Sequence, residues 1–461
     1  MTLKPVKTSV RARYPMLYWL TFVNLVGLPS FISFDGSGRT HNNGLFNLTS
    51  ISRMSLVFIT VYILAVVLLL DRKPIFGRRL NVYMLPWLIL LGLNTVSIVF
   101  QVPGHLTPPL ATDLPLCLFR LGEWFLGFVL ILILYSRVPR EEGLRLMVDL
   151  IGQTSWVAIV MVWIMVPIAP GLAFGATDDS GSLHLLGGQF YGPTDLALHA
   201  GCAFFYSLFF IRGAHTRWAA CLVALVTLEM TRSRSQLLGF LFALACYVLF
   251  YYRRPGMRVL ALGTLLIAGV VALPFSGSLV DYLARGQGLR GLQSLDDRTM
   301  VWQASWDAIQ GHPIMGHGFL IGARNAIRDH WIYSHWVPPH AHNDILQAML
   351  QTGALGGLAM LYIYAWQIRR CILNARLGPQ HLLLLLVVVQ LSITSLTSPV
   401  LSVQYASLGG IFFLCWIGSA DEPPLTKEKR VSVLARSWRE PKPVIFAEVS
   451  RRLSLRVDEF P

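Results

Sequence analysis

The stretch MSLVFITVYILAVVLLLDRKPIFGRR, residues 54–79, joins a long apolar run to a short basic connector. A run of roughly 20 apolar residues is long enough for a helix to cross the hydrocarbon core of a bilayer. The basic residues that follow, Arg72, Lys73, Arg78 and Arg79, are typical of a loop on the cytoplasmic side. This stretch therefore predicts a membrane-spanning helix that ends in the cytoplasm.

The same pattern recurs over most of the 461 residues, of which 54% are hydrophobic and only 13% are charged. A soluble protein of this size carries roughly 25% charged residues. Apolar stretches of spanning length lie at residues 14–34, 51–70, 81–101, 116–136, 147–168, 193–212, 217–232, 235–252, 258–276, 345–367, 380–397 and 403–419. The sequence therefore predicts an all-α, polytopic membrane protein with about 12 transmembrane helices.

Basic connectors follow every second apolar stretch, so both termini are expected in the cytoplasm. The longest connector, residues 277–344, then lies on the outer side of the membrane. We divide the chain into a membrane-embedded domain, residues 1–420, which includes this loop, and a cytoplasmic tail, residues 421–461. The net charge of +14 does not indicate a nucleic-acid-binding protein, because the basic residues cluster in short connectors between spans.

The long outer loop contains a pattern that predicts a short amphipathic helix. Asp296 or Asp297 can cap this helix, and Gly311 with Pro313 can end it. Its apolar stripe is expected from the spacing of Trp302, Trp306 and Ile309. Such a helix would lie on the membrane surface or on the helical bundle.

Arginine supplies the positive charge on the predicted outer side, because all six lysines of the chain lie on the predicted cytoplasmic side. The planar guanidinium can hold phosphate oxygens through two hydrogen bonds, so a diphosphate-bearing ligand would balance this charge. The candidate ligands of that diphosphate are Arg120, Arg232, Arg234, Arg285, Arg290 and Arg298. The open alternatives are an ion pair of Arg120 with Glu123, three residues later on the same helical face, and anchoring of Arg232 and Arg234 to lipid headgroups.

The stretch PHAHNDILQAMLQTGALGG, residues 339–357, places polar groups directly before the tenth apolar stretch. A helix N-terminus disfavours a protonated imidazole, so His342 is expected to stay neutral and to accept a proton. Gly353 and Gly356 would let another helix or a lipid chain approach closely. The rival interpretation is a zinc site formed by His335, His340, His342 and Asp344, although the short His-x-His spacing also arises by chance.

Three segments resemble motifs of the O-antigen ligase and polymerase superfamily of bacterial inner membranes. HNDILQAMLQTGALG fits the signature His-Asn-x9-Gly-x2-Gly, with His342, Asn343, Gly353 and Gly356. TRSRSQLLGFLFAL is similar to the Ser-Arg turn of that family and places Arg234 on its arginine. RTMVWQASWDAIQGHPIMGHG resembles the family's Arg-x3-Trp and Pro-x2-Gly-x-Gly segment, which begins here at Arg298.

The resemblance implies a metal-independent, inverting glycosyltransferase of the GT-C type that needs no cofactor. Its donor would be a glycan on undecaprenyl diphosphate, and the ligase branch would transfer that glycan to lipid A–core on the periplasmic face of a Gram-negative inner membrane. In that mechanism His342 is the base, the arginines hold the leaving diphosphate, and Asn343, His340, Glu123, Gly353 and Gly356 support the site. Three alternatives remain open: an O-antigen polymerase, a protein O-oligosaccharyltransferase, and a transporter, which is disfavoured because no internal repeat is found.

Overall fold

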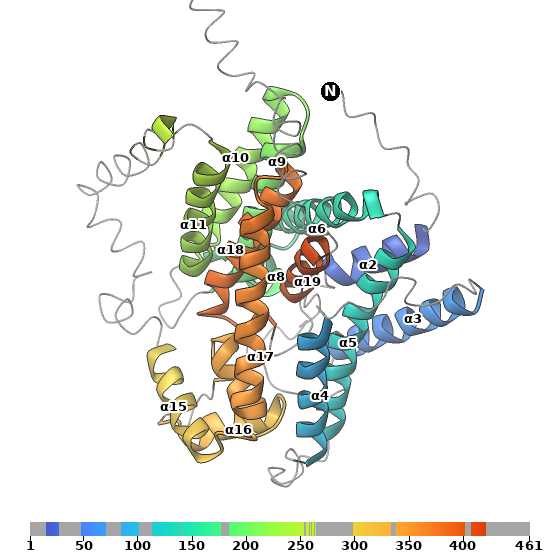
Figure 1. The fold of residues 1–461 in the computed structure, drawn as a ribbon, viewed down its shortest axis with the longest axis vertical. Coiled ribbons are helices and arrows are strands. Elements are labelled where there is room, and N and C mark those ends of the chain that lie inside the picture. Colours follow the sequence, from blue (N-terminus) through green and yellow to red (C-terminus); the bar gives the residue numbers. More distant parts are fainter. Residues whose placement is uncertain are drawn as a thin grey trace, which may run out of the picture.

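The computed structural model describes residues 15–26, 48–70, 84–100, 113–138, 140–176, 184–252, 255–257, 259, 261, 263, 298–332, 338–401 and 407–420. In these parts the chain is almost entirely helical (Figure 1). The helices of the first half are α2 (Pro15–Val26), α3 (Leu48–Leu70), α4 (Leu85–Phe100), α5 (Asp113–Arg137), α6 (Arg140–Ile168), α7 (Pro170–Ala173) and α8 (Gly188–Tyr191). Those of the second half are α9 (Pro193–Phe210), α10 (Ala214–Met230), α11 (Arg234–Tyr251), α15 (Arg298–Gly311), α16 (Ile321–Asp329), α17 (Asp344–Asn374), α18 (Pro379–Ser395) and α19 (Ser407–Ala420).

Helices occupy the predicted apolar stretches wherever the structure describes them, and the stretch at 258–276 lies mostly outside the described residues. Among the described residues, four helices are long and apolar enough to cross a membrane: Cys117–Arg137, Glu142–Ile168, Arg234–Tyr251 and Asp344–Asn374. Shorter apolar helices cover Pro15–Val26, Leu85–Phe100, Pro379–Ser395 and Leu408–Ser419. The described part of the chain is therefore a helical membrane protein, whose number of spans stays a prediction.

One small sheet departs from the all-α prediction. Strand β1 (Phe174–Ala176) pairs antiparallel with β2 (His184–Leu186), and Phe174 lies opposite Leu186. This two-stranded hairpin lies between α7 and α8, in a connector that is poor in lysine and arginine. Two three-residue strands carry almost no periodic signal, which is why apolar periodicity did not predict them.

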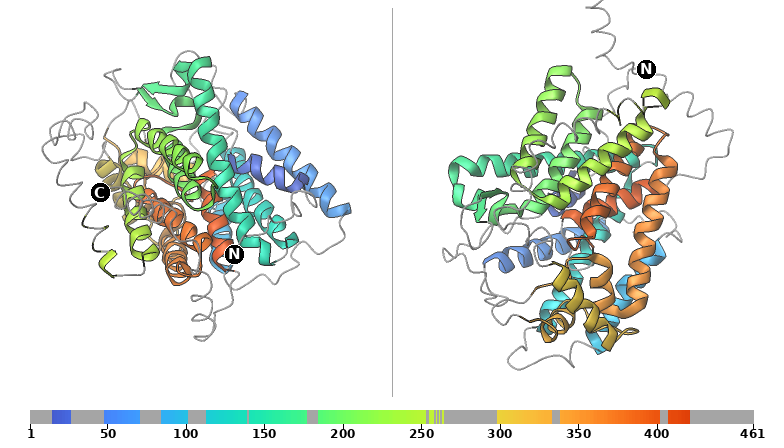
Figure 2. Two further views of the ribbon diagram at one scale, coloured as in Figure 1. Left: turned by 90° about the horizontal axis from the view of Figure 1, so that it is seen from above. Right: turned by 90° about the vertical axis from the view of Figure 1, so that its left-hand side faces the viewer.

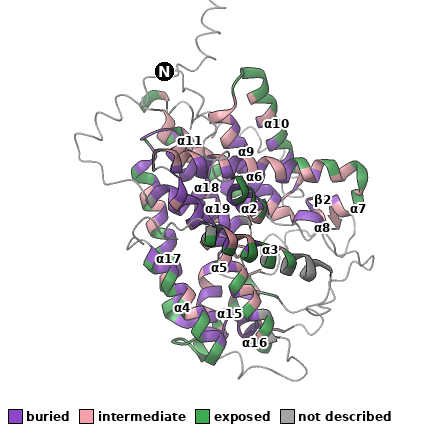
Figure 3. Cartoon of the chain, turned by 90° about the vertical axis from the view of Figure 1, so that its right-hand side faces the viewer, coloured by how far each residue is buried: buried purple, intermediate pink, exposed green. Residues whose placement is uncertain are grey.

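The centre of the molecule is formed by α18 and α19, which are buried on nearly all sides (Figure 3). Residues 382–388 of α18 are leucines and valines that are all buried, because α18 packs against α9, α11, α17 and α19. A helix that is apolar all round is expected in such a central position. Helices α9, α10 and α11 lie toward one end of the molecule and α15 and α16 toward the other, as the right-hand view of Figure 2 shows.

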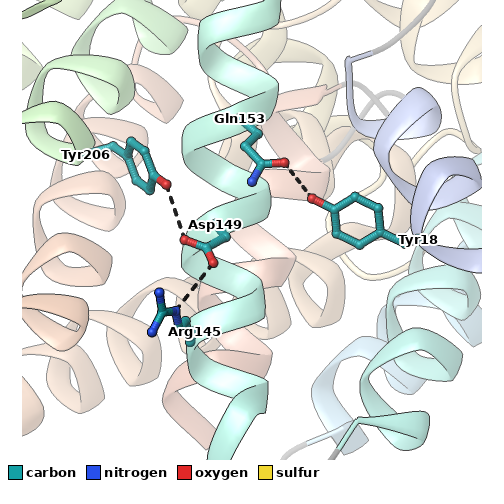
Figure 4. Close-up of polar contacts among 5 residues, drawn as sticks. All are labelled: Tyr18, Arg145, Asp149, Gln153 and Tyr206. Atoms are coloured by element: carbon teal, nitrogen blue, oxygen red, sulfur yellow. Dashed lines mark hydrogen bonds and ion pairs between the residues drawn. The ribbon is translucent and has the colours of Figure 1, made fainter. Parts of the chain in front are cut away.

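Polar side chains on one half of α6 connect this helix to two neighbours (Figure 4). The Tyr18 hydroxyl of α2 donates to Gln153 Oε1 at 2.6 Å. The Tyr206 hydroxyl of α9 donates to Asp149 Oδ1 at 3.2 Å, and Arg145 lies 3.7 Å from the other carboxylate oxygen. These contacts satisfy polar groups within the bundle and fix α2 and α9 along α6, because an unsatisfied group away from water is costly.

The predicted loop helix is present as α15, which begins at Arg298 and ends at Gly311. Its predicted apolar stripe is wrong in part, because Trp306 is 46% exposed. The side that packs on α16 and α17 is formed instead by small and branched residues: Val301, Ala304, Ser305, Ala308 and Ile309. Small side chains let α15 approach α17 closely, and the large indole of Trp306 is left outside this contact.

Candidate active site

The first part of α17 is folded back against the rest of the helix. The Tyr364 hydroxyl donates to Asp344 Oδ2 at 2.6 Å, although the two residues are 20 positions apart. In a straight helix they would be separated by roughly 30 Å. The reversal occurs at Thr352 and Gly353, which have non-helical backbone angles, with φ of +70° at Gly353. We therefore describe α17 as a helical hairpin with a short arm, residues 344–351, and a long arm, residues 354–374.

This hairpin corrects the sequence expectation for the tenth apolar stretch, which was a single span with His342 at its outer mouth. The short arm instead leads away from His342 to the turn, and the long arm returns past it, so that Asp344 and Tyr364 meet. His342 consequently lies beside the middle of the long arm and not at the tip of the hairpin.

A loop after α15 holds the turn of the hairpin. The Ala354 amide donates to the Pro313 carbonyl at 2.8 Å, and the amides of His317 and Gly318 donate to the carbonyls of Leu350 and Gln351. These contacts use the carbonyls that the short arm leaves free at its C-terminal end. The Pro-x2-Gly-x-Gly segment is thus a structural latch that connects α15 to the hairpin.

Glycine is required at the latch and in the turn for steric reasons. Gly316 has φ of +69°, and a Cβ there would meet the backbone of Gln351–Gly353 at 2.6–2.7 Å. A Cβ on Gly353 would collide with the backbone of Ile314. Gly356 faces Ala348 and Thr352. A close neighbour was expected at Gly353 and Gly356. At Gly353 this neighbour is the loop after α15, and at Gly356 it is the short arm of the same hairpin.

Asn343 caps the short arm and connects it to α18. Its Oδ1 accepts hydrogen bonds from the amides of Ile345 and Leu346 at 2.9 and 3.0 Å, which is the usual role of an N-cap side chain. Its Nδ2 donates to the carbonyl of Leu396, the C-cap of α18, at 3.2 Å. Both ends of this amide are used, so Asn343 places the N-terminus of the short arm against the end of α18.

His342 lies in a tight turn with a backbone conformation that is uncommon for its residue type. Its φ is +50°, in the left-handed region that costs roughly 1–2 kcal/mol for a residue with a side chain. The centroid of its ring lies 4.2 Å from that of His340, and its backbone amide donates to His340 Nδ1 at 3.4 Å. Strain of this kind persists where the surroundings fix the chain, as they often do at functional sites.

The surroundings of His342 favour its neutral form. Burial lowers the pKa of His342 from 6.5 to about 3, and the neighbouring His340 and Arg298 lower the pKa in the same direction. The pKa of His340 falls to about 4, mainly through burial and also through Arg298. The neutral imidazole was expected from the helix terminus, whereas its main cause in the structure is loss of solvent.

Arg298, at the first residue of α15, is therefore close enough to both histidines for its charge to act on them. Arg298 and the latch belong to one segment of chain, since the latch follows α15 directly. The hairpin and α15 thus bring a cation and a neutral base together. A negatively charged group bound at Arg298 would act on both histidines in the opposite direction and favour their charged forms.

Asp344 fixes the base of the hairpin. Its carboxylate is fully buried and accepts hydrogen bonds from the amides of Val400 and Leu401 at 3.0–3.1 Å, in addition to the Tyr364 hydroxyl. The indole of Trp124 in α5 donates to the carbonyl of Leu401 at 3.2 Å. Asp344 therefore connects the short arm, the long arm and the chain after α18.

Arg234 and Arg232 lie where α11 begins, on the side of the bundle where α18 ends. Gln390 Nε2 donates to Gln236 Oε1 at 3.1 Å, so the first turn of α11 lies beside the last turns of α18. Arg232 has φ of +48°, and its backbone turns the chain from α10 into α11. Since Leu396 at the end of α18 accepts from Asn343, the ends of α11, α18 and the short arm belong to one region.

Arg120 forms the ion pair with Glu123 that was the alternative to phosphate binding, with Nη1 and Oε2 2.7 Å apart. It lies between Cys117, whose thiol donates to the Phe319 carbonyl, and Trp124, which contacts Leu401. This part of α5 therefore lies between the loop after α15 and the chain after α18. Arg120 is near the region of the candidate site, but its strongest contact is with its own helix.

Several predicted residues are not brought together or cannot be placed. Arg285, Arg290 and His335 lie outside the described residues. The rival metal site loses Asp344, because that carboxylate is turned to Tyr364, Val400 and Leu401 and away from the histidines. Within the described ranges, three or more His, Cys, Asp or Glu side chains are nowhere grouped as metal ligands.

Sequence reasoning missed four residues that build the site: Trp124, Gln347, Tyr364 and Leu401. Gln347 and Tyr364 are polar residues within an apolar stretch, and this was the one sequence feature that could have indicated their role. The contact of Asp344 with residues 400–401 spans more than 50 positions and has no local pattern. The contact of Asp344 with Tyr364 depends on the reversal at Gly353, which apolar periodicity cannot reveal.

Residues 219–361 match the family model described as O-antigen ligase. The match extends from α10 to the long arm of α17 and includes Arg232, Arg234, Arg298, His340, His342, Asn343, Gly353 and Gly356. It confirms the resemblance seen in the three motifs. No curated protein matches the chain.

Proposed function

We propose that this membrane protein, through its O-antigen ligase domain at residues 219–361, transfers a glycan from undecaprenyl diphosphate to a sugar hydroxyl of lipid A–core. The reaction would complete lipopolysaccharide at the periplasmic face of a Gram-negative inner membrane. The observation that supports it best is a neutral, half-buried His342 at the base of the helical hairpin, within reach of the charge of Arg298. Such a pair suits a reaction that removes a proton and releases an anion.

In the proposed mechanism, His342 takes the proton of the acceptor hydroxyl. The hydroxyl oxygen forms a bond to the anomeric carbon from the face opposite the leaving group, and the bond between that carbon and the diphosphate breaks, which inverts the anomeric centre. The imidazolium then releases its proton to solvent. The diphosphate-lipid bond is already activated, so the transfer needs no nucleotide.

Arginines would stabilise the charge that grows on the leaving diphosphate. Arg298 is the first candidate, because its charge already acts on His342 and His340. Arg234 is the second, since α11 begins where α18 ends and where Asn343 meets Leu396. Arg120 would contribute only by giving up or sharing its pair with Glu123. Arg232, Arg285 and Arg290 remain candidates from their sequence positions.

The reaction is proposed to be independent of metal ions, because the arginines supply the positive charge. The purified protein should then keep its activity in EDTA. Loss of transfer in EDTA with recovery on adding one divalent cation would instead support His340 and His342 as metal ligands.

A deletion strain tests the proposed function and separates the ligase from the polymerase. Ligase activity predicts lipopolysaccharide without any O-antigen, while lipid-linked polymer is retained in the membrane. A core that carries a single repeat would indicate the polymerase, which uses a second lipid-linked glycan as acceptor. Normal lipopolysaccharide in the deletion strain would contradict both. Complementation with His342→Ala should fail at normal protein levels, because loss of a general base costs roughly 10²–10⁴-fold.

A further inference from the structure

We propose that Gln347 is a positioning residue for the reaction, which holds the His340–His342 turn from inside the hairpin. This inference rests on the proposed function, since it assigns a role toward the base of that reaction. Gln347 lies in the first turn of the short arm and is only 1% exposed. Its Oε1 accepts a hydrogen bond from the amide of Ala341 at 2.8 Å.

The bonded amide belongs to the residue between the two histidines. Ala341 is itself fully buried, so Gln347 is its route to a hydrogen bond in a place without solvent. A buried amide without an acceptor is costly, and the turn would rearrange to find one. Because the next residue is His342, held at φ of +50°, any rearrangement of Ala341 changes the direction of the imidazole.

Only one end of the Gln347 side chain does this. Its Nε2 is buried and has no hydrogen-bond partner among the described residues. Among the described residues, the Gln347 side chain therefore acts only through its oxygen, which accepts from the Ala341 amide. The charged groups near the turn act in other ways. Arg298 acts on both histidines through its charge, and the Asp344 carboxylate is turned to Tyr364, Val400 and Leu401.

Gln351 provides a matched control one helical turn further along the short arm. It is also 1% exposed, and its Nε2 also lacks a partner among the described residues. Its side chain makes no hydrogen bond to the His340–His342 turn, and its backbone carbonyl accepts from the amide of Gly318. Replacing either glutamine by methionine removes a buried amide of nearly the same volume, but only Gln347→Met removes the contact with Ala341.

The experiment compares Gln347→Met, Gln351→Met and Gln347→Glu by in vitro transfer and by thermal unfolding. The donor is the lipid-linked O-antigen extracted from the deletion strain, and the acceptor is its lipid A–core. Gln347→Met should lower kcat roughly tenfold to a hundredfold with little change in KM, because a small displacement of a reacting group has such an effect. Gln351→Met should keep a kcat within about twofold of the wild type while unfolding at a similar temperature.

Gln347→Glu keeps an acceptor for the Ala341 amide. It therefore tests whether this hydrogen bond positions His342 even if Gln347→Met does not fold. It should recover most of the rate, and its carboxylate should move the acid limb of the pH–rate profile to higher pH by favouring the imidazolium. Equal rates for Gln347→Met and Gln351→Met, or a Gln347→Glu rate as low as that of Gln347→Met with an unmoved acid limb, would overturn the inference. Absence of transfer by the wild-type protein would count instead against the proposed function.

Discussion

His342 combines partial burial, a strained backbone and the charge of Arg298 at one residue. A pKa of about 3 keeps the imidazole neutral over the whole physiological range, but it also makes the ring a weak base in the empty site. A diphosphate bound at Arg298 would bring negative charge close to the ring and raise the pKa of His342 toward neutrality. The donor would thereby strengthen the base that its own reaction requires.

The pH dependence of transfer provides a residue-scale prediction. Because the pKa of His342 is lowered, its neutral form is present above the lowered value and is lost only as the pH falls toward about 3. The acid limb of kcat/KM, which reports the free enzyme, should therefore lie well below pH 6.5. The acid limb of kcat, which reports the donor complex, should lie at higher pH.

Arg298→Gln should raise the pKa of His342 and move the acid limb of kcat/KM toward higher pH, in addition to slowing transfer. The control is Arg328→Gln, because Arg328 is exposed and paired with Asp329 on the surface of α16. An acid limb that stays in place in Arg298→Gln would show that its charge does not act on the catalytic base.

At the scale of elements, the hairpin in α17 is the unit that assembles the site. Its short arm is capped by Asn343, its turn is held by the loop after α15, and its base is held by Asp344. An arm of eight residues is too short to be stable alone, so its stability comes from these contacts. Through these residues the histidine turn depends on the end of α18, the loop after α15 and the chain at residues 400–401.

Gly353→Ala should disrupt the hairpin, because its φ is +70° and a Cβ would collide with the backbone of Ile314. We expect a large loss of thermal stability in the region of the latch and loss of transfer. Gly311→Ala is the matched control, since a Cβ at the end of α15 meets nothing within 4 Å. If both variants unfold at the wild-type temperature and transfer equally well, the turn at Gly353 is not required.

Tyr364→Phe should loosen the base of the hairpin without leaving it unfolded. A hydrogen bond to a charged group contributes about 1.5–3 kcal/mol, and the amides of Val400 and Leu401 would still hold the Asp344 carboxylate. Thermal unfolding should show a moderate decrease. Asp344→Ala should be more damaging, since it leaves two buried amides without an acceptor. A Tyr364→Phe loss as large as that of Asp344→Ala would contradict this division of roles.

At the scale of the whole molecule, α15 and α16 lie together at one end and the bundle of α9, α10 and α11 lies toward the other (Figure 2). The proposed orientation puts the α15 end in the periplasm and the tail after residue 420 in the cytoplasm. The exposed residues Gln310 and Arg328 lie on these two helices and offer positions for labelling.

Cysteines introduced at Gln310 and Arg328 should react with a membrane-impermeant maleimide in intact spheroplasts, and a cysteine in residues 421–461 should react only after permeabilisation. The native cysteines give a low background, since five of the six are buried and Cys246 is half-buried. Labelling of the tail in intact spheroplasts, with none at Gln310 and Arg328, would reverse the orientation and move the candidate site to the cytoplasm.

The sequence by itself determined the class of the protein, the positions of most helices and the family of its central segment. Apolar stretches of spanning length became helices wherever they are described, because a segment in lipid must satisfy its backbone hydrogen bonds within itself. The loop helix from Arg298 to Gly311 was also predicted, from its capping and terminating residues. These features depend on neighbouring residues, and a linear pattern records them.

Only the tertiary structure decided how the candidate site is assembled. One glycine at positive φ converts an apparent span into a hairpin, and nothing in the apolar pattern before and after Gly353 distinguishes the two. The contact of Asp344 with Tyr364 follows from that reversal, and the contacts of Asp344 with residues 400–401 and the exposure of Trp306 follow from packing between separate elements. The physical reason is that each such contact joins residues whose proximity depends on packing and not on sequence separation, so no local periodicity records it.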